Sequence, residues 1–359
     1  MGPGNARAVI VGMGRSWCQS PGPSLWGLGR SQDLWGGLVL LVLILALQAC
    51  RPQYPAAVQP ELPLPERPDL VVEAERAAQF IGHAGVSFVD ARASHRYLRG
   101  HVPGAVHVDW RDFVSSQRKH PDGRLAVDST YLGGVLGGLG VSGDDWVIVL
   151  GDPLNGWGED GRIAWTLMSL GVDRLSVVSG GFPAWEASGL PVQRGRIRRP
   201  PVPWRASLRD DYVARKRDVI DIVDRGGAWD YVLVDVRSSG EFRGAFDAPR
   251  HGVLRPGHIP TSVNLPWREL LAEDGRFLPR EKLEGLLIPR GVRPDAQIVT
   301  YCTGGVRSAH TWFVLHWLGY PSVRSYAGSL WEWSMDRGLP VEKGGHRPRQ
   351  PGPPWPTTQ

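Results

Sequence analysis

The chain has 359 residues, of which 42% are hydrophobic and 21% charged, and it contains 16 tryptophans and 31 prolines. This length and composition suit two folded domains, each with a core of its own, and exclude a disordered polar chain. The formal net charge of +5 comes from arginines spread along the sequence, without a basic helix or an aromatic-basic stripe, so we expect no nucleic-acid partner.

The first 50 residues predict an export signal. Several arginines precede an apolar run of 14 residues, 34–47, which is short for a membrane span and typical of the apolar core of such a signal. The run closes on the letters LQAC, which resemble a bacterial lipobox and would place a lipid on Cys50. An uncleaved anchor and an ordinary cleaved signal remain alternatives, and Met1 and Met13 are both candidate start residues. We therefore expect an exported, periplasmic protein that a lipid anchor holds at a membrane.

A proline-rich stretch, 51–69, follows and predicts an extended tether without a core. The chain has three cysteines, and two of them, Cys18 and Cys50, precede this tether. An exported compartment favours disulfides, so a solitary thiol there is usually explained by chemistry or by deep burial. If Cys50 carries lipid, Cys302 has no partner left and is such a solitary thiol.

The folded region contains an internal repeat. The segment FVDARASHRYLRGHVPGAVHVDW, from Phe88, matches LVDVRSSGEFRG, from Leu233, and RPGHIPTSVNLPW, which ends at Trp267. A second pair of matching segments begins at Leu170 and at Leu318. Two copies of one domain explain both matches.

We assign residues 70–195 to the first copy, residues 196–343 to the second, and residues 344–359 to a flexible tail. Strands alternate with helical segments in each copy, which predicts an α/β domain with a mainly parallel sheet flanked by helices. Ligands of such sheets bind at the carboxyl ends of the strands. The oligomeric state stays open.

Cys302 belongs to the segment YCTGGVRSAH, which follows an apolar run typical of a buried strand and precedes an apolar segment of helical length. We expect the cysteine where the strand ends and the helix begins. Backbone amides and the helix dipole would stabilise its thiolate and lower its pKa, which makes the sulfur nucleophilic. Gly304 and Gly305 permit the positive φ angles that such a cradle needs.

Over residues 69–342 the chain resembles tandem-domain rhodaneses, which are sulfurtransferases. The segments VDVRSSGEF, RPGHIPTSVNLPW, YCTGGVRSAHTWFVL and YAGSLWEW carry the resemblance in the right order. It implies two rhodanese-like domains and a catalytic cycle on Cys302. The cysteine would take a sulfane sulfur from a small donor, hold it as a persulfide, and pass it to a thiophilic acceptor such as cyanide or a thiol.

The number of residues between Cys302 and Arg307 helps to distinguish sulfur transfer from phosphate-ester hydrolysis. Four residues lie between Cys302 and Arg307, one fewer than in cysteine phosphatases of the related fold, so the cradle suits a sulfur atom rather than a phosphate. The loop looks more like that of thiosulfate sulfurtransferases than that of mercaptopyruvate enzymes, so we expect an anionic donor such as thiosulfate. A 3-mercaptopyruvate sulfurtransferase and a non-enzymatic sulfur carrier or oxyanion sensor remain alternatives. Thr303 and Glu241 stand where some relatives carry arginine.

Arg307 is the best cation for a sulfonate group, because its planar fork can hold two oxygens. The other expected substrate-binding residues share its loop: Thr303, Gly304, Gly305, Val306 and Ser308. Arg243 and Arg255 are secondary candidates, with ordinary surface charge as the alternative. We expect Trp331 and Trp333 to wall the pocket or to pack between the domains.

Three further residues are predicted to support the site. Asp235 and Arg237 would form an ion pair at the end of a strand, and His258 would pack or form hydrogen bonds rather than act as a base. The histidines lack ligand spacing, so we expect neither a metal nor a cofactor. In the first copy, Asp152 aligns with Cys302, and an aspartate cannot hold a transferable sulfur. We therefore expect the first domain to be silent and to close one face of the pocket.

Overall fold

The computed structural model describes residues 63–114, 123–227, 230–246 and 252–345. The predicted export signal with Cys50, most of the proline-rich tether and nearly all of the tail lie outside these residues. These described residues form one compact unit that holds two α/β domains. No helix within the described ranges is long and apolar enough to cross a membrane.

The first domain is built on a five-stranded parallel sheet with the order β1-β5-β4-β2-β3. Its strands are β1 (Val71–Val72), β2 (Val86–Asp90), β3 (Val106–His107), β4 (Trp146–Leu150) and β5 (Leu175–Val178). Its helices are α2 (Ala74–Ala78), α3 (Ser94–Arg99), α4 (Ser129–Gly138), α5 (Glu159–Ser169) and α6 (Gly181–Ala187). Successive side chains of a strand point to opposite faces, so a strand covered on both sides is apolar throughout. In β4, Ile148 packs with α2 and α6, whereas Val147 and Val149 pack with α4 and α5.

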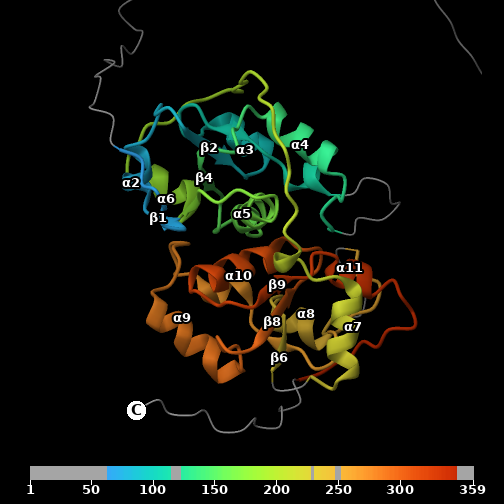
Figure 1. The fold of residues 1–359 in the computed structure, drawn as a ribbon. Coiled ribbons are helices and arrows are strands. Elements are labelled where there is room, and N and C mark those ends of the chain that lie inside the picture. The colour runs from blue at the N-terminus through green and yellow to red at the C-terminus, as the bar shows by residue number, and fades with distance from the viewer. Residues whose placement is uncertain (1–62, 115–122, 228–229, 247–251, 346–359) are drawn as a thin grey trace, which may run out of the picture. The chain divides into compact units, whose positions relative to one another are not determined.

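The second domain repeats this arrangement with a four-stranded parallel sheet of order β7-β6-β8-β9. Its strands are β6 (Tyr231–Asp235), β7 (Val263–Asn264), β8 (Gln297–Tyr301) and β9 (Val323–Ser325). Its helices are α7 (Lys216–Asp224), α8 (Ser239–Arg243), α9 (Arg280–Leu287), α10 (Val306–Trp317) and α11 (Ser329–Trp333). In β8, Val299 packs with α7 and α11, and Ile298 packs with α9 and α10. Two α/β domains with parallel sheets and flanking helices confirm the predicted fold class (Figure 1).

Helices α5 and α10 pack against each other and join the two domains (Figure 1). Glycine makes this contact close, because a Cβ on Gly161 of α5 would lie 2.4 Å from the Cα of His310 in α10. Buried residues of both helices, such as Trp165 and Phe313, belong to a single apolar cluster. The first domain therefore packs directly on the helix that follows Cys302.

Residues 196–209, which we assigned to the second copy, run along the first domain. The amide of Val202 donates to the carbonyl of Gly137, and the amide of Arg209 donates to the carbonyl of Ser169. The half-buried ring of Trp204 packs against the apolar cluster that includes α4 and α5. An extended segment without a strand or helix gives no sequence signal for the domain on which it packs, so its location could not be predicted.

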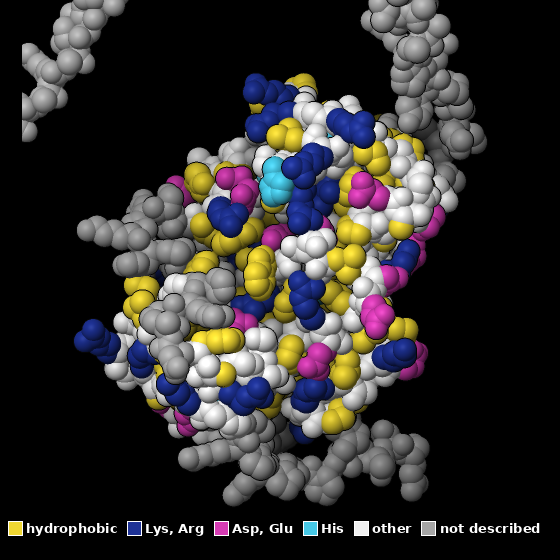
Figure 2. All heavy atoms as spheres, turned by 180° about the vertical axis from the view of Figure 1, so that it is seen from behind, with side chains coloured by type: hydrophobic (Ala, Val, Ile, Leu, Met, Phe, Trp, Pro, Cys, Tyr) yellow, Lys and Arg dark blue, Asp and Glu magenta, His cyan; other side chains and the backbone are white. Residues whose placement is uncertain are grey.

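Surface charges of both signs are interspersed on the face shown in Figure 2. Basic side chains gather around a histidine in the upper part of this face, with carboxylates close by. Most of the face therefore has the mixed charge of an ordinary solvated surface.

Candidate active site

Cys302 lies directly after β8, in the short loop that leads into α10. The residue is 1% exposed, and its Sγ accepts a hydrogen bond from the amide of Gly305 at 3.1 Å. Its own amide donates to Oγ of Ser329 at 3.0 Å. Gly305 caps α10 with a φ of 85°, a left-handed conformation that favours glycine. The prediction that Cys302 lies between a strand and a helix is confirmed.

Opposing effects determine the ionisation of Cys302. Burial by itself raises the pKa of a thiol, because the thiolate loses its hydration. The charge of Arg307 and the backbone amides of the loop and of α10 outweigh burial, so the pKa of Cys302 lies below its ordinary value. These amides belong to Gly304, Gly305 and Ser308. A lowered pKa increases the share of thiolate at neutral pH, which is the form that attacks sulfur.

Arg307 is paired with a carboxylate. Its two terminal nitrogens donate to the two carboxylate oxygens of Glu241 at 2.9 and 3.0 Å, and Nη2 also donates to Oγ1 of Thr303 at 2.6 Å. Desolvation would raise the pKa of Glu241, but the hydrogen bonds and charge of Arg307 lower it to about 2. The ring of Trp157, from the first domain, lies 5.3 Å from the guanidinium carbon. A donor that reaches Cys302 therefore meets an arginine whose charge is already balanced.

A cavity of about 460 Å³ opens beside Cys302, and both domains line it. This volume suits a small-molecule ligand. The second domain contributes Ser238, Glu241, Phe246, Thr303, Gly304, Val306, Arg307 and Trp331. The first domain contributes Trp110, Arg111, Trp157 and Glu159. The expectation that the first domain closes one face of the pocket is confirmed.

The first domain adds one charge of each sign to the pocket. The guanidinium of Arg111 lies 4.9 Å from the ring of Trp110. Glu159 accepts a hydrogen bond from the amide of Trp157 at 2.7 Å, and burial raises the pKa of its carboxyl group. Together with Arg307 and Glu241, the lining holds two guanidinium groups and two carboxyl groups among aromatic walls. The pocket is therefore not strongly positive.

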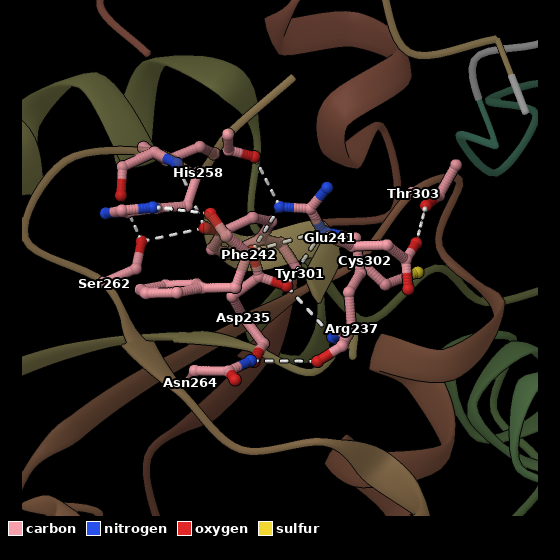
Figure 3. A network of polar contacts seen from close by, with 12 residues as sticks. Asp235, Arg237, Glu241, Phe242, His258, Ser262, Asn264, Tyr301, Cys302 and Thr303 are labelled. Carbon is pink, nitrogen blue, oxygen red and sulfur yellow. Dashed lines mark hydrogen bonds and ion pairs between the residues drawn. The ribbon is translucent and has the colours of Figure 1, made fainter. Parts of the chain in front are cut away.

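A buried polar network lies beside the loop that holds Cys302 (Figure 3). Arg237 pairs with the carboxylate of Asp235 at 2.5 Å and donates to the carbonyl of Gly257 at 2.7 Å, so the pair joins the end of β6 to a neighbouring loop. Nδ1 of His258 donates a hydrogen bond to the carbonyl of Phe242, 2.9 Å away, and the two rings stack with their centroids 3.8 Å apart. Figure 3 also shows Glu241 bonded to Thr303 beside Cys302. This geometry agrees with a structural role for all three predicted supporting residues.

The first domain contains the same supporting pair, but an aspartate stands at the position that Cys302 occupies in the second domain. Arg92 pairs with Asp90 at 2.6 Å and donates to the carbonyl of Gly100, as Arg237 does in the second domain. After β4, at the position of Cys302, Asp152 forms an ion pair with Arg96 and accepts a hydrogen bond from the amide of Asn155. The carboxylate of Asp152 is thus occupied by local contacts.

The predicted substrate-binding residues divide into two groups. The cavity is lined by Thr303, Gly304, Val306 and Arg307. The other two, Gly305 and Ser308, do not line it, and their backbone amides stabilise the thiolate of Cys302. The side chain of Ser308 is buried and accepts a hydrogen bond from Oγ of Ser325 at 3.2 Å.

Two secondary predictions, for Arg255 and Trp333, are wrong, and for Arg243 the alternative of ordinary surface charge holds. Arg255 donates to four backbone carbonyls between residues 333 and 339, so it stabilises a loop and does not line the pocket. Arg243 is exposed and lies outside the cavity lining. Trp333 is fully buried in the core of the second domain, where its indole donates to the carbonyl of Pro340. Of the two tryptophans, only Trp331 walls the pocket.

Sequence reasoning missed the residues that the first domain contributes to the pocket. Trp110 and Arg111 lie in a 3₁₀ turn (Trp110–Phe113) after β3, and Trp157 and Glu159 lie at the start of α5. All four follow the carboxyl ends of strands, the edge at which ligands of parallel sheets bind.

Known proteins resemble this chain over most of its length. The family model described as a rhodanese-like domain matches residues 73–188 and again residues 218–336. A protein of Thermus thermophilus named "Sulfur carrier protein TtuD" is 36% identical over 259 residues, which cover 69% of this chain and 87% of that protein. A protein of Mycobacterium leprae named "Putative thiosulfate sulfurtransferase" is 34% identical over 285 residues, which cover 77% of this chain and 99% of that protein.

Solved structures agree on the fold. The structure titled "The wildtype structure of EanB" has a TM-score of 0.69 at 21% identity and covers 77% of this chain and 70% of its own. An anaerobic ergothioneine biosynthesis enzyme from Chlorobium limicola also gives a TM-score of 0.69 at 21% identity. The two matched domains and the relatives together show that this chain belongs to the rhodanese family of sulfurtransferases, as a member with two rhodanese-like domains.

Proposed function

We propose that this protein transfers sulfane sulfur through a persulfide on Cys302. The main support for this proposal is the surroundings of Cys302. Its buried sulfur accepts a hydrogen bond from the Gly305 amide and lies beside Arg307, and the pKa of the thiol is below its ordinary value. The thiolate attacks the sulfane sulfur of the donor, a bond forms between Sγ and that sulfur, and the remainder of the donor leaves with the bonding electron pair. From thiosulfate the leaving group is sulfite.

In the second half of the cycle an acceptor attacks the outer sulfur of the persulfide. The bond between the two sulfurs breaks, and its electron pair returns to Sγ as thiolate. Cyanide would leave as thiocyanate, and a thiolate acceptor would leave as a persulfide. The amides that stabilise the thiolate lower the barrier to this step, because negative charge develops on Sγ as the bond breaks. The same cradle thus assists both halves of the cycle.

Thiosulfate is the donor that we propose, in line with the name of the mycobacterial relative. The bidentate pair between Arg307 and Glu241 weakens the binding of thiosulfate. The guanidinium must leave the carboxylate before it can hold a sulfonate group. 3-Mercaptopyruvate, which carries a single carboxylate, remains the alternative donor. A comparison of kcat/KM for the two donors, with cyanide as acceptor, decides between them.

A sulfur carrier is the second candidate, because a relative at 36% identity carries that name. A carrier would accept one sulfur per chain from a donor and release it only to a partner protein. The enzyme proposed here turns over repeatedly with small molecules, since its cavity of about 460 Å³ is of small-molecule size. Thiocyanate formed in excess over protein favours the enzyme, and a single stoichiometric release favours the carrier.

The variant Cys302→Ser tests the nucleophile. Serine has nearly the same shape but cannot hold sulfane sulfur, so the variant should fold and form no thiocyanate. Turnover retained in this variant would remove Cys302 from the mechanism.

We also propose that the protein is exported and carries a lipid on Cys50, on the basis of the apolar run and the lipobox-like end of residues 1–50. Metabolic labelling with a radioactive fatty acid in a bacterial host tests this. The label should appear on the parent protein and be absent from Cys50→Ala. A label that persists in the variant would contradict the assignment.

A further inference from the structure

Arg162 of α5 reaches from the first domain to the loop that holds Cys302. Its Nη1 donates to the carbonyl oxygen of Gly305 at 3.1 Å, and its Nη2 donates to the carbonyl oxygen of Gly123 at 2.7 Å. The side chain is fully buried, and its guanidinium carbon lies 4.8 Å from the ring of Trp165. Burial of a cation is costly unless hydrogen bonds compensate for lost hydration. The hydrogen bonds to Gly305 and Gly123 therefore help to compensate for the burial of the Arg162 charge.

Gly305 is held at both of its polar groups. Its amide donates to Sγ of Cys302 at 3.1 Å, and its carbonyl accepts from Arg162. The residue is left-handed, with φ 85° and ψ 0°, and a Cβ on it would lie 2.5 Å from the carbonyl oxygen of Ala327. The amide and the carbonyl belong to adjacent peptide planes. A fixed carbonyl thus restricts the backbone rotation that would turn the amide away from the sulfur.

Gly123 gives the second contact of the first domain with the loop. Its φ is 64°, and a Cβ on it would lie 2.2 Å from the carbonyl oxygen of Gly304. Only a hydrogen atom fits at this position, so the backbone of the first domain lies directly against the loop. Arg162 bonds to Gly123 on one side and to Gly305 on the other, and it therefore joins the two backbones.

We propose that Arg162 is a positioning residue for the proposed reaction: by holding the Gly305 carbonyl, it keeps the Gly305 amide on the sulfur of Cys302. The first domain would then determine the geometry around Cys302 in the second domain. The inference rests on the proposed function for its effect on turnover. The ionisation of the Cys302 thiol, in contrast, can be measured whether or not the protein transfers sulfur.

The test replaces Arg162 with methionine, which keeps the length of the side chain and removes its donors. The rate of alkylation of Cys302 by iodoacetamide is followed from low to high pH by mass spectrometry of the peptide that contains it. We expect an alkylation midpoint at higher pH and a rate about tenfold lower at neutral pH, as the loss of one hydrogen bond from a charged donor implies. Turnover should lose kcat and keep KM, because Arg162 does not line the cavity.

Arg199→Met is the matched control. Arg199 is a half-buried arginine that donates to Oγ of Ser87 and to the carbonyl of Gly104, both at 2.7 Å and both within the first domain. Its loss should leave the alkylation profile unchanged. The charged groups of the pocket, Arg307 and Glu241 from the second domain and Arg111 and Glu159 from the first, are kept in every variant.

An alkylation profile for folded Arg162→Met that equals the parent profile overturns the proposal. If that variant does not fold, Arg162→Lys decides, since lysine keeps the charge but lacks the planar fork that bridges two carbonyls. A midpoint shifted in the same direction by a smaller amount supports the positioning role, and an unshifted midpoint overturns it. Failure of the proposed function looks different: the parent itself would not turn over, while the shift in alkylation would persist.

Discussion

Glu241→Gln should increase the use of thiosulfate. The carboxylate of Glu241 occupies both terminal nitrogens of Arg307, so a dianionic donor now competes with it for the guanidinium. Glutamine keeps an oxygen that can still accept the Ser238 amide at the start of α8, which preserves the cap of that helix. The substitution thus removes one negative charge from the pocket and leaves the local backbone contacts in place.

The structure sets the size of the effect. The pKa of Glu241 falls from an ordinary value of 4.5 to about 2, and its side chain is 20% exposed. A shift of this size corresponds to roughly 3 kcal/mol of interaction between the carboxylate and its surroundings, to which Arg307 makes the main favourable contribution. Glutamine retains part of that interaction as a neutral hydrogen bond. We therefore expect a gain of about 1.4 kcal/mol in transition-state binding, or about tenfold in kcat/KM for thiosulfate.

The assay compares initial rates of thiocyanate formation from thiosulfate and from a neutral organic trisulfide, with cyanide as acceptor. The ratio of kcat/KM for the two donors should rise about tenfold in favour of thiosulfate, because the neutral donor does not need the guanidinium. Glu159→Gln is the matched control: Glu159 is the other carboxyl group of the pocket, and it is bonded to the Trp157 amide rather than to an arginine. Its replacement should change the ratio less. An unchanged or lower ratio in Glu241→Gln would refute the role given to the pair.

Three other outcomes are expected. Asp152→Ala should leave kcat within about twofold of the parent, because its loop has no part in the proposed reaction, and a loss as large as that of Cys302→Ser would show that the first domain is not silent. Asp235→Asn leaves the buried charge of Arg237 without its partner and should lower the free energy of unfolding in urea by about 3 kcal/mol. The pKa of Glu241 is depressed on folding, so its stabilisation is complete above about pH 4.5 and is lost as the pH falls towards about 2. The difference in unfolding free energy between the parent and Glu241→Gln should accordingly shrink over that range, and a difference that grows towards acid would contradict the assignment.

The position of Cys302 could be predicted because its signals are local. An apolar run predicts the strand, the glycines predict the turn, and the next apolar segment predicts the helix, so the cysteine falls between them without knowledge of the rest of the fold. The observed strand, Gln297–Tyr301, ends directly before the cysteine. The pair Asp235 and Arg237 is also local, since its members are separated by two positions.

Contacts between distant parts of the chain could not be predicted. Glu241 and Arg307 are 66 positions apart, and their pairing depends on how α8 packs beside the loop of Cys302. Arg162 is 143 positions from Gly305, in the other domain. The predictions for Arg255 and Trp333 were wrong for a related reason. The sequence near a motif does not show whether an arginine or a tryptophan faces a pocket or packs in a core. Only tertiary packing separates these cases.

The central claim is a persulfide on Cys302, and mass spectrometry of the protein after incubation with thiosulfate tests it most directly. The peptide that contains Cys302 should gain the mass of one sulfur atom. Addition of cyanide should remove that mass and yield an equal amount of thiocyanate. A protein that forms thiocyanate while the Cys302 peptide never gains sulfur would contradict the account.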